Sequence, residues 1–146
     1  MSQIRLVKQK DDTGCGIACA AMVANCSYEK AKRMLMKQEG WKKLNRKVYT
    51  RARHIKPLLN KLGLKCEIKK SKSWKDYDGL SIVGVNSDED GYFHWVVVIK
   101  DKKHFLIIDP SKGEIFNGAK RTKKKFIHRK SSMYISISSS VSNIKI

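Results

Sequence analysis

The sequence predicts an α+β fold in which N-terminal helices pack on a C-terminal antiparallel sheet. Two observations predict it. Residues 15–62 carry helical patterns, with apolar residues three or four positions apart and capping residues at the ends. Residues 64–139 instead contain short segments rich in β-branched and aromatic residues, separated by polar turns. Helices first and antiparallel strands second is a typical α+β order.

The chain has 146 residues, of which 41% are apolar, and these occur in periodic blocks. This length is sufficient for one domain with a buried core. We therefore expect a single domain over residues 1–146, with its core at about 4–139, a basic loop at 120–130 and a flexible tail at 140–146. The sequence contains no visible internal repeat or domain boundary.

Two helices are predicted in the first 40 residues. The first runs from about Cys15 to Asn25 and is apolar on nearly every side, so we expect it to be buried. The second runs from Tyr28 to Glu39, with Ser27 as its N-cap and Gly40 just past its end.

A third helix is expected to end at about Leu62, with Thr50 as its N-cap and Gly63 as its terminator. Pro57 lies inside this pattern. The helix therefore either begins near Lys56, which places the proline in the first turn, or is longer and kinked.

The remaining patterns predict a sheet. Residues 92–99 and 104–110 are rich in β-branched and aromatic residues, and the short polar link between them indicates an antiparallel hairpin. The other expected strands are residues 64–69, 80–85, 115–116, 133–139 (closing the sheet) and 4–8 (a short edge strand).

Cys15 stands between Gly14 and Gly16, where the first helix begins. The partial positive charge and unpaired N–H groups of a helix N-terminus favour a thiolate, which is the reactive form of cysteine. Glycine on either side leaves the sulfur accessible. The alternative is a small core residue, since free cysteines are among the most buried residue types. A base elsewhere in the chain decides between the two.

His94 and Asp109 supply such a base and its partner. His94 lies near the start of the first hairpin strand, and Asp109 lies near the end of the second. Antiparallel pairing brings these positions to the same end of the ladder, where a carboxylate can orient an imidazole. A cysteine at a helix N-terminus, a histidine on a strand and an acid on its neighbour form a cysteine–histidine–acid arrangement.

The order Gln9, Gly-Cys-Gly-x-Ala-Cys at 14–19, His-Trp-Val-Val-Val at 94–98 and Ile-Asp-Pro at 108–110 resembles the bacteriocin-processing, double-glycine leader peptidases. These form a compact branch of the papain-like cysteine peptidases. The resemblance spans roughly residues 7–113 and implies a papain-like fold. It also implies that Cys15, His94 and Asp109 are catalytic and that Gln9, six residues before the cysteine, helps to form the oxyanion hole.

Two departures from this family bear on the substrate. Many members carry aspartate immediately before the cysteine, where this chain has Gly14, a variant typical of an outer branch. The best-known members are also fused to a membrane transporter, which is absent from this sequence. The fold and the catalytic set therefore carry over better than the double-glycine leader substrate does.

The other histidines and cysteines have weaker claims. His104 is the competing base, but hairpin pairing leaves it at the opposite end from Asp109. His54 and His128 stand in basic surroundings and are expected at the surface, whereas Cys19 is expected in the core. A zinc site formed by Cys15, Cys19 and His94 is an alternative that the spacing does not select, and no cofactor is expected.

The formal net charge of +19 is extreme for this length, with 32 basic and 13 acidic residues. It favours affinity for anionic polymers, although a solvated lysine-rich face is the commoner explanation of such a charge. The candidate polyanion-binding residues are Lys120, Arg121, Lys123, Lys124, Lys125, Arg129 and Lys130.

The leading functional hypothesis is a cysteine peptidase that acts on a peptide or protein, with an acidic substrate matching the basic surface. One alternative is a papain-fold toxin or effector that binds or cleaves RNA. Another is a deamidase or transglutaminase with the same triad. The scattered cysteines, together with the absence of a signal-like or membrane-spanning run, predict a soluble cytoplasmic protein, unless it is delivered to another cell.

Overall fold

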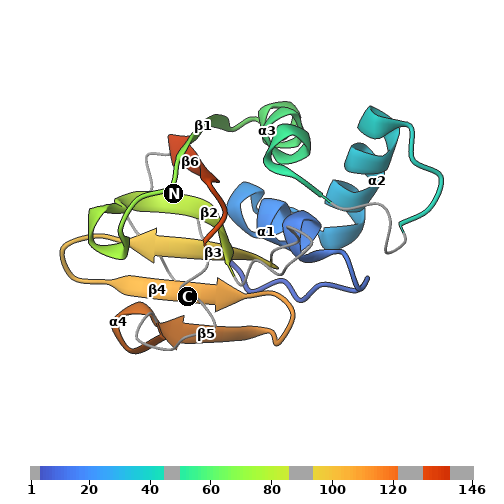
Figure 1. Ribbon diagram of the computed structural model, residues 1–146. Coiled ribbons are helices and arrows are strands. Elements are labelled where there is room, and N and C mark those ends of the chain that lie inside the picture. Colours follow the sequence, from blue (N-terminus) through green and yellow to red (C-terminus); the bar gives the residue numbers. More distant parts are fainter. Residues whose placement is uncertain (1–3, 45–49, 86–93, 122–129, 139–146) are drawn as a thin grey trace.

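The computed structural model describes residues 4–44, 50–85, 94–121 and 130–138. Within these segments, α1 (Cys15–Ala24) and α3 (Ala52–Lys61) pack on one face of a six-stranded antiparallel sheet, and α2 (Tyr28–Glu39) packs against these two helices (Figure 1). The predicted α+β fold is therefore confirmed. The other helices are the short α4 (Gly118–Arg121) and the 3-10 turn η1 (Trp74–Asp76). The strands are β1 (Lys65–Lys70), β2 (Gly79–Val85), β3 (His94–Lys100), β4 (Phe105–Asp109), β5 (Glu114–Asn117) and β6 (Met133–Ser138).

The strand order is β1-β6-β2-β3-β4-β5, and every neighbouring pair is antiparallel. The sequence analysis predicted that the last strand closes the sheet. This prediction is wrong, because β6 lies between β1 and β2. Its side chains suit this interior position, because Ile135 and Ile137 join the core beneath the helices while Tyr134 packs on the opposite face.

Helix α1 lies at the centre of the core, in contact with β3, α2 and α3. Because its residues are apolar on nearly every side, it can be enclosed in this way, and nine of its ten residues are buried. Strand β3 is also buried on both faces: Trp95, Val97 and Ile99 face the helices, whereas Val96 and Val98 pack in a second cluster. The element that begins at the cysteine thus packs directly on the strand that begins at the histidine.

Two predicted elements differ from the structure. Residues 4–8 are not a strand. Helix α3 is capped by Arg51 rather than Thr50. Thr50 is buried, and its carbonyl accepts a hydrogen bond from the Trp95 indole at 2.7 Å. The helix then continues through Pro57, so the longer of the two predicted helices is the correct one. No helix in the described segments has the length and apolar character needed to cross a membrane.

Candidate active site

Cys15 is the first residue of α1 and is 6% exposed. Its sulfur accepts a hydrogen bond from the backbone N–H of Trp95 at 3.4 Å. This contact joins the N-terminus of α1 to the start of β3, one residue past His94. The thiol therefore combines the favourable field of a helix N-terminus with a strand that carries a potential base.

Gly16 explains why the helix can approach the strand so closely. A Cβ at this position would lie 2.9 Å from Thr50 Cγ2 and 3.2 Å from Trp95 Cδ1. The backbone of Gly16 is not in the left-handed region, so space rather than conformation requires the glycine. A larger residue would push α1, and the Cys15 sulfur with it, away from β3.

His94 opens β3 and Asp109 closes β4, and the register of these strands, with Val97 opposite Ile108, brings both residues to one end of the ladder. The Nε2 atom of His94 lies 2.7 Å from Oδ1 of Asp109. The structure thus brings together Cys15, His94 and Asp109, as the sequence predicted. With Nε2 held by the carboxylate, Nδ1 is the ring nitrogen that remains for the thiol.

Ser111 is a member of this site that the sequence analysis missed. Its backbone N–H and its hydroxyl donate to Asp109 Oδ1 at 2.9 and 2.7 Å. The available signal was the Asp-Pro-Ser sequence at the end of a strand, because an aspartate that starts a turn commonly bonds the backbone two residues later. These bonds fix the carboxylate that orients the imidazole.

The electrostatics of the pair favour its charged form. Burial opposes the imidazolium of His94, but hydrogen bonds to Asp109 and Cys15 and the charges of both partners outweigh it and raise its pKa to about 9. Burial likewise opposes ionisation of Asp109, but the hydrogen bonds from His94 and Ser111 lower the pKa of its carboxyl well below the usual value. His94 is thus suited to hold a proton beside an anion.

Gln9 lies next to this end of the sheet, where its backbone N–H donates to the Pro110 carbonyl at 3.0 Å. Its side-chain nitrogen donates to the carbonyls of Asp11 and Asp12 at 3.0 and 3.3 Å. The side-chain oxygen is buried and has no hydrogen-bond partner in the described part of the chain. The side chain is therefore held by the loop that leads to Cys15.

The comparisons with known proteins concern the family and the fold. Residues 3–137 match the peptidase C39 family. The chain belongs to that family. No curated protein matches the sequence significantly. Among solved structures, the fold is similar to that of a double glycine motif protease from an AMS/PCAT transporter, crystallised in complex with the leader peptide; the identity is 17%, the TM-score is 0.64, and the match covers 93% of this chain and 91% of that one. The protein is thus a cysteine peptidase with the papain-like fold.

The remaining histidines of this C39 peptidase lie outside the site. His104 bonds Asp101 at the far end of the hairpin, as expected. His54 was predicted at the surface but is 8% exposed, because its ring packs edge-on against Trp41 and its Nδ1 accepts the N–H of Arg51 at the start of α3. His128 lies outside the described residues.

The other cysteines and the metal hypothesis can be treated together. Cys19 is fully buried in the core. Burial raises its pKa well above the usual value, and the charges of Cys15 and Asp109 raise it further. Across residues 4–44, 50–85, 94–121 and 130–138, no group of three or more histidine, cysteine or acidic side chains is placed to hold a metal ion. The zinc alternative therefore has no structural support there.

Most of the predicted polyanion-binding block lies outside the described residues, including Lys123, Lys124, Lys125 and Arg129. Lys120 is exposed after β5, and Arg121 ends α4. Lys130 is engaged within the protein: its Nζ lies 4.8 Å from the ring centre of Trp74 and donates to the Lys72 carbonyl. Lys130 thus anchors an aromatic cluster.

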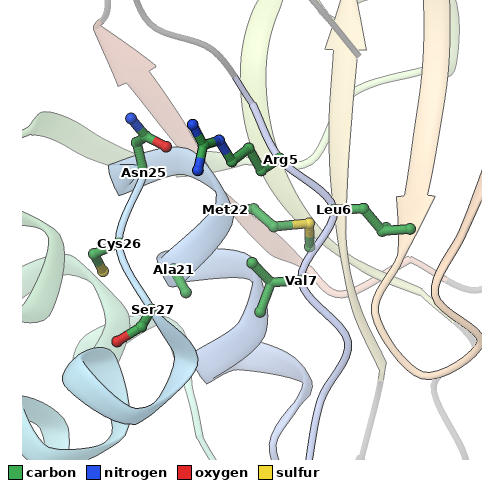
Figure 2. A pocket seen from close by; sticks show the side chains of 8 residues that line it. All are labelled: Arg5, Leu6, Val7, Ala21, Met22, Asn25, Cys26 and Ser27. Atoms are coloured by element: carbon green, nitrogen blue, oxygen red, sulfur yellow. The ribbon is translucent and has the colours of Figure 1, made fainter.

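A pocket of about 290 Å³ lies at the other end of α1, between this helix and the N-terminal segment (Figure 2). Its lining includes Leu6 and Val7 from that segment and Met22 and Asn25 from the end of α1. Its lining on α1 begins at Ala21, six residues from Cys15, or roughly 9 Å along the helix. It is therefore distinct from the candidate active site.

Proposed function

We propose that Cys15, His94 and Asp109 hydrolyse a peptide bond, with Gln9 and the backbone N–H of Cys15 as oxyanion donors. The single observation that carries this proposal is the 2.7 Å contact between His94 and Asp109, on an imidazole that also bonds Cys15. A nucleophile, a base and an orienting group in contact are the requirement for covalent catalysis.

In the proposed reaction His94 Nδ1 takes the proton of Cys15, and the thiolate attacks the substrate carbonyl carbon. The imidazolium then donates this proton to the leaving amine, and an acyl-enzyme remains. Water, deprotonated by His94, attacks the acyl carbon and releases the thiol. Asp109 accepts the Nε2 hydrogen throughout, so it holds the ring in the tautomer that leaves Nδ1 directed at sulfur.

Gln9 is proposed to stabilise the oxyanion, a contribution of about 3 kcal/mol for one donor in comparable sites. Its side-chain nitrogen has two hydrogens, which without substrate are directed to Asp11 O and Asp12 O. The longer bond, to Asp12 at 3.3 Å, is the one we expect to be exchanged for the oxyanion.

For the substrate we propose a peptide or protein segment, since the related transporter protease was crystallised with a leader peptide. The net charge of +19 favours an acidic segment. Four free cysteines support a reducing compartment, and we propose the cytoplasm as the site of action.

The test is cleavage of a peptide library by the full-length protein, read by mass spectrometry. We expect cleavage by the wild type, with sites enriched in acidic residues, and loss of all cleavage in Cys15→Ala. Cys26→Ala, which alters a half-buried thiol at the other end of α1, is the matched control and should cleave like the wild type. Cleavage that persists in Cys15→Ala would contradict the proposal.

Two alternatives use the same scaffold. The charge favours RNA binding, which we expect to weaken steeply as salt is raised and to be lost when Lys123, Lys124 and Lys125 are neutralised. An effector delivered to another cell would fit this activity.

A deamidase or transglutaminase would release ammonia from glutamine side chains without cleaving the chain. Measuring ammonia alongside peptide cleavage separates these reactions.

A further inference from the structure

Asp11 lies in the loop that leads to Cys15, here called the nucleophile loop (residues 9–14), and it ties this loop to α2. Its two carboxylate oxygens are held by α2: Tyr28 donates to Oδ2 at 2.6 Å and Lys32 to Oδ1 at 3.0 Å. Tyr28 and Lys32 are four residues apart and therefore lie on the same face of the helix. The backbone carbonyl of Asp11 accepts hydrogen bonds from the Gly14 N–H and from the Gln9 side-chain nitrogen, both at 3.0 Å.

The Tyr28 hydroxyl also occupies the space beside Gly14. A Cβ at Gly14 would overlap this hydroxyl oxygen and lie 3.1 Å from Tyr28 Cζ and from the Asp11 carbonyl. The backbone of Gly14 has φ −90° and ψ 8°, which any residue can adopt. Space, rather than conformation, therefore requires glycine immediately before Cys15.

We propose that Tyr28, together with Asp11 and Gly14, is a positioning device that fixes the Gln9 amide and the Cys15 N–H for oxyanion stabilisation. This inference rests on the proposed function of that site. Tyr28 is 3% exposed and starts a helix with its own N-cap, so its hydroxyl is held rigidly. The hydroxyl thus occupies the space that a side chain before Cys15 would need.

The device can be tested without a known peptide substrate, by comparing two reactions of Cys15. Acylation by p-nitrophenyl acetate forms a thioester and expels nitrophenolate through an oxyanion. Alkylation by iodoacetamide displaces iodide from a saturated carbon and forms no oxyanion. A residue that positions the oxyanion donors should affect only the first reaction.

We expect Tyr28→Phe to slow acylation about tenfold, as a small misplacement of donors can do, while alkylation stays near the wild-type rate. Tyr77→Phe is the matched control, because Tyr77 is also 3% exposed and its hydroxyl accepts from the Lys72 N–H on the other side of the sheet. It should change neither rate. Unchanged acylation in Tyr28→Phe, or an equal fall in both reactions, would overturn the inference.

The contact with Gly14 gives an independent test. Gly14→Ala should slow acylation because its methyl group meets the Tyr28 hydroxyl, and Gly14→Ala/Tyr28→Phe should be no slower than the slower single variant. Additive losses would contradict a shared device. Failure of the proposed function itself is recognised separately. If Cys15 is not the nucleophile, Cys15→Ala should release nitrophenolate at the wild-type rate.

Discussion

The thiol of Cys15 differs from the other three in its surroundings. Burial raises the pKa of Cys19, Cys26 and Cys66 above the usual value, whereas Cys15 lies at a helix N-terminus beside His94. We expect iodoacetamide at neutral pH to alkylate Cys15 first, and His94→Ala to slow that reaction by at least about tenfold. Peptide mapping by mass spectrometry measures both. Equal labelling of all four cysteines, unaffected by the substitution, would contradict the pairing.

The His94–Asp109 pair also predicts a pH dependence of stability. The folded pKa of His94 is raised from 6.5 to about 9, so its contribution is complete below pH 6.5 and is lost as pH rises through 9. The pKa of Asp109 is lowered from 3.8, so its contribution is present above that pH and lost in acid. His94→Ala should therefore cost most stability between pH 3.8 and pH 6.5, where both contributions are complete, up to about 3 kcal/mol.

Urea unfolding at several pH values measures this difference. His104→Ala is the control, because the His104–Asp101 pair is more than half exposed and should contribute little at any pH. A cost of His94→Ala that does not vary between pH 5 and pH 9 would exclude this account.

The central residues of the site were predictable because they depend on local patterns. Antiparallel pairing alone places His94 and Asp109 at one end of a hairpin. The Trp95 N–H on the sulfur and the surroundings of His54 depend on how α1 and α3 pack, and no local pattern encodes that packing. Basic neighbours in the sequence indicated exposure for His54, but the neighbour that matters in space is Trp41.

Among the elements, α2 was predicted from end to end, because it carries its own signals. The Ser27 hydroxyl accepts the Lys30 N–H at 3.1 Å, and Gly40 ends the helix with φ 69°. Ser27→Ala should lower the free energy of unfolding by about 1 kcal/mol. Ser73→Ala is the matched control, since Ser73 precedes η1 without a side-chain capping bond. Thermal unfolding compares the two, and an equal loss would argue against the cap.

Other elements could not be predicted, because their identity depends on partners far away in the sequence. Residues 4–8 alternate like a strand, yet they are not assigned to the sheet, and the nearby Gln9 bonds Pro110 instead. The 133–138 strand was found, but its place between β1 and β2 follows from contacts across more than 50 residues. Alternation indicates a strand without specifying its neighbours.

At the scale of the whole molecule, β6 is the central link of the sheet, because it pairs with β1 on one side and β2 on the other. A chain that ends at Ser132 lacks both pairings and should not fold cooperatively. A chain that ends at Ser139 lacks only the predicted flexible tail and should unfold like the full-length protein. Circular dichroism during thermal unfolding distinguishes the two. A marked loss of stability in the chain that ends at Ser139 would show that the tail prediction is wrong.

The position of β6 has a consequence for how the enzyme matures during translation. Cys15, His94 and Asp109 have all been synthesised before the ribosome reaches residue 133, yet β2, which flanks the histidine strand, still lacks one neighbour at that stage. We expect a nascent chain to hold only the β2-β3-β4-β5 part of the sheet, and to remain inactive, until residues 133–138 emerge. Proteolytic activity would then begin only after residues 133–138 have left the ribosome, which delays exposure of the producing cell to the peptidase.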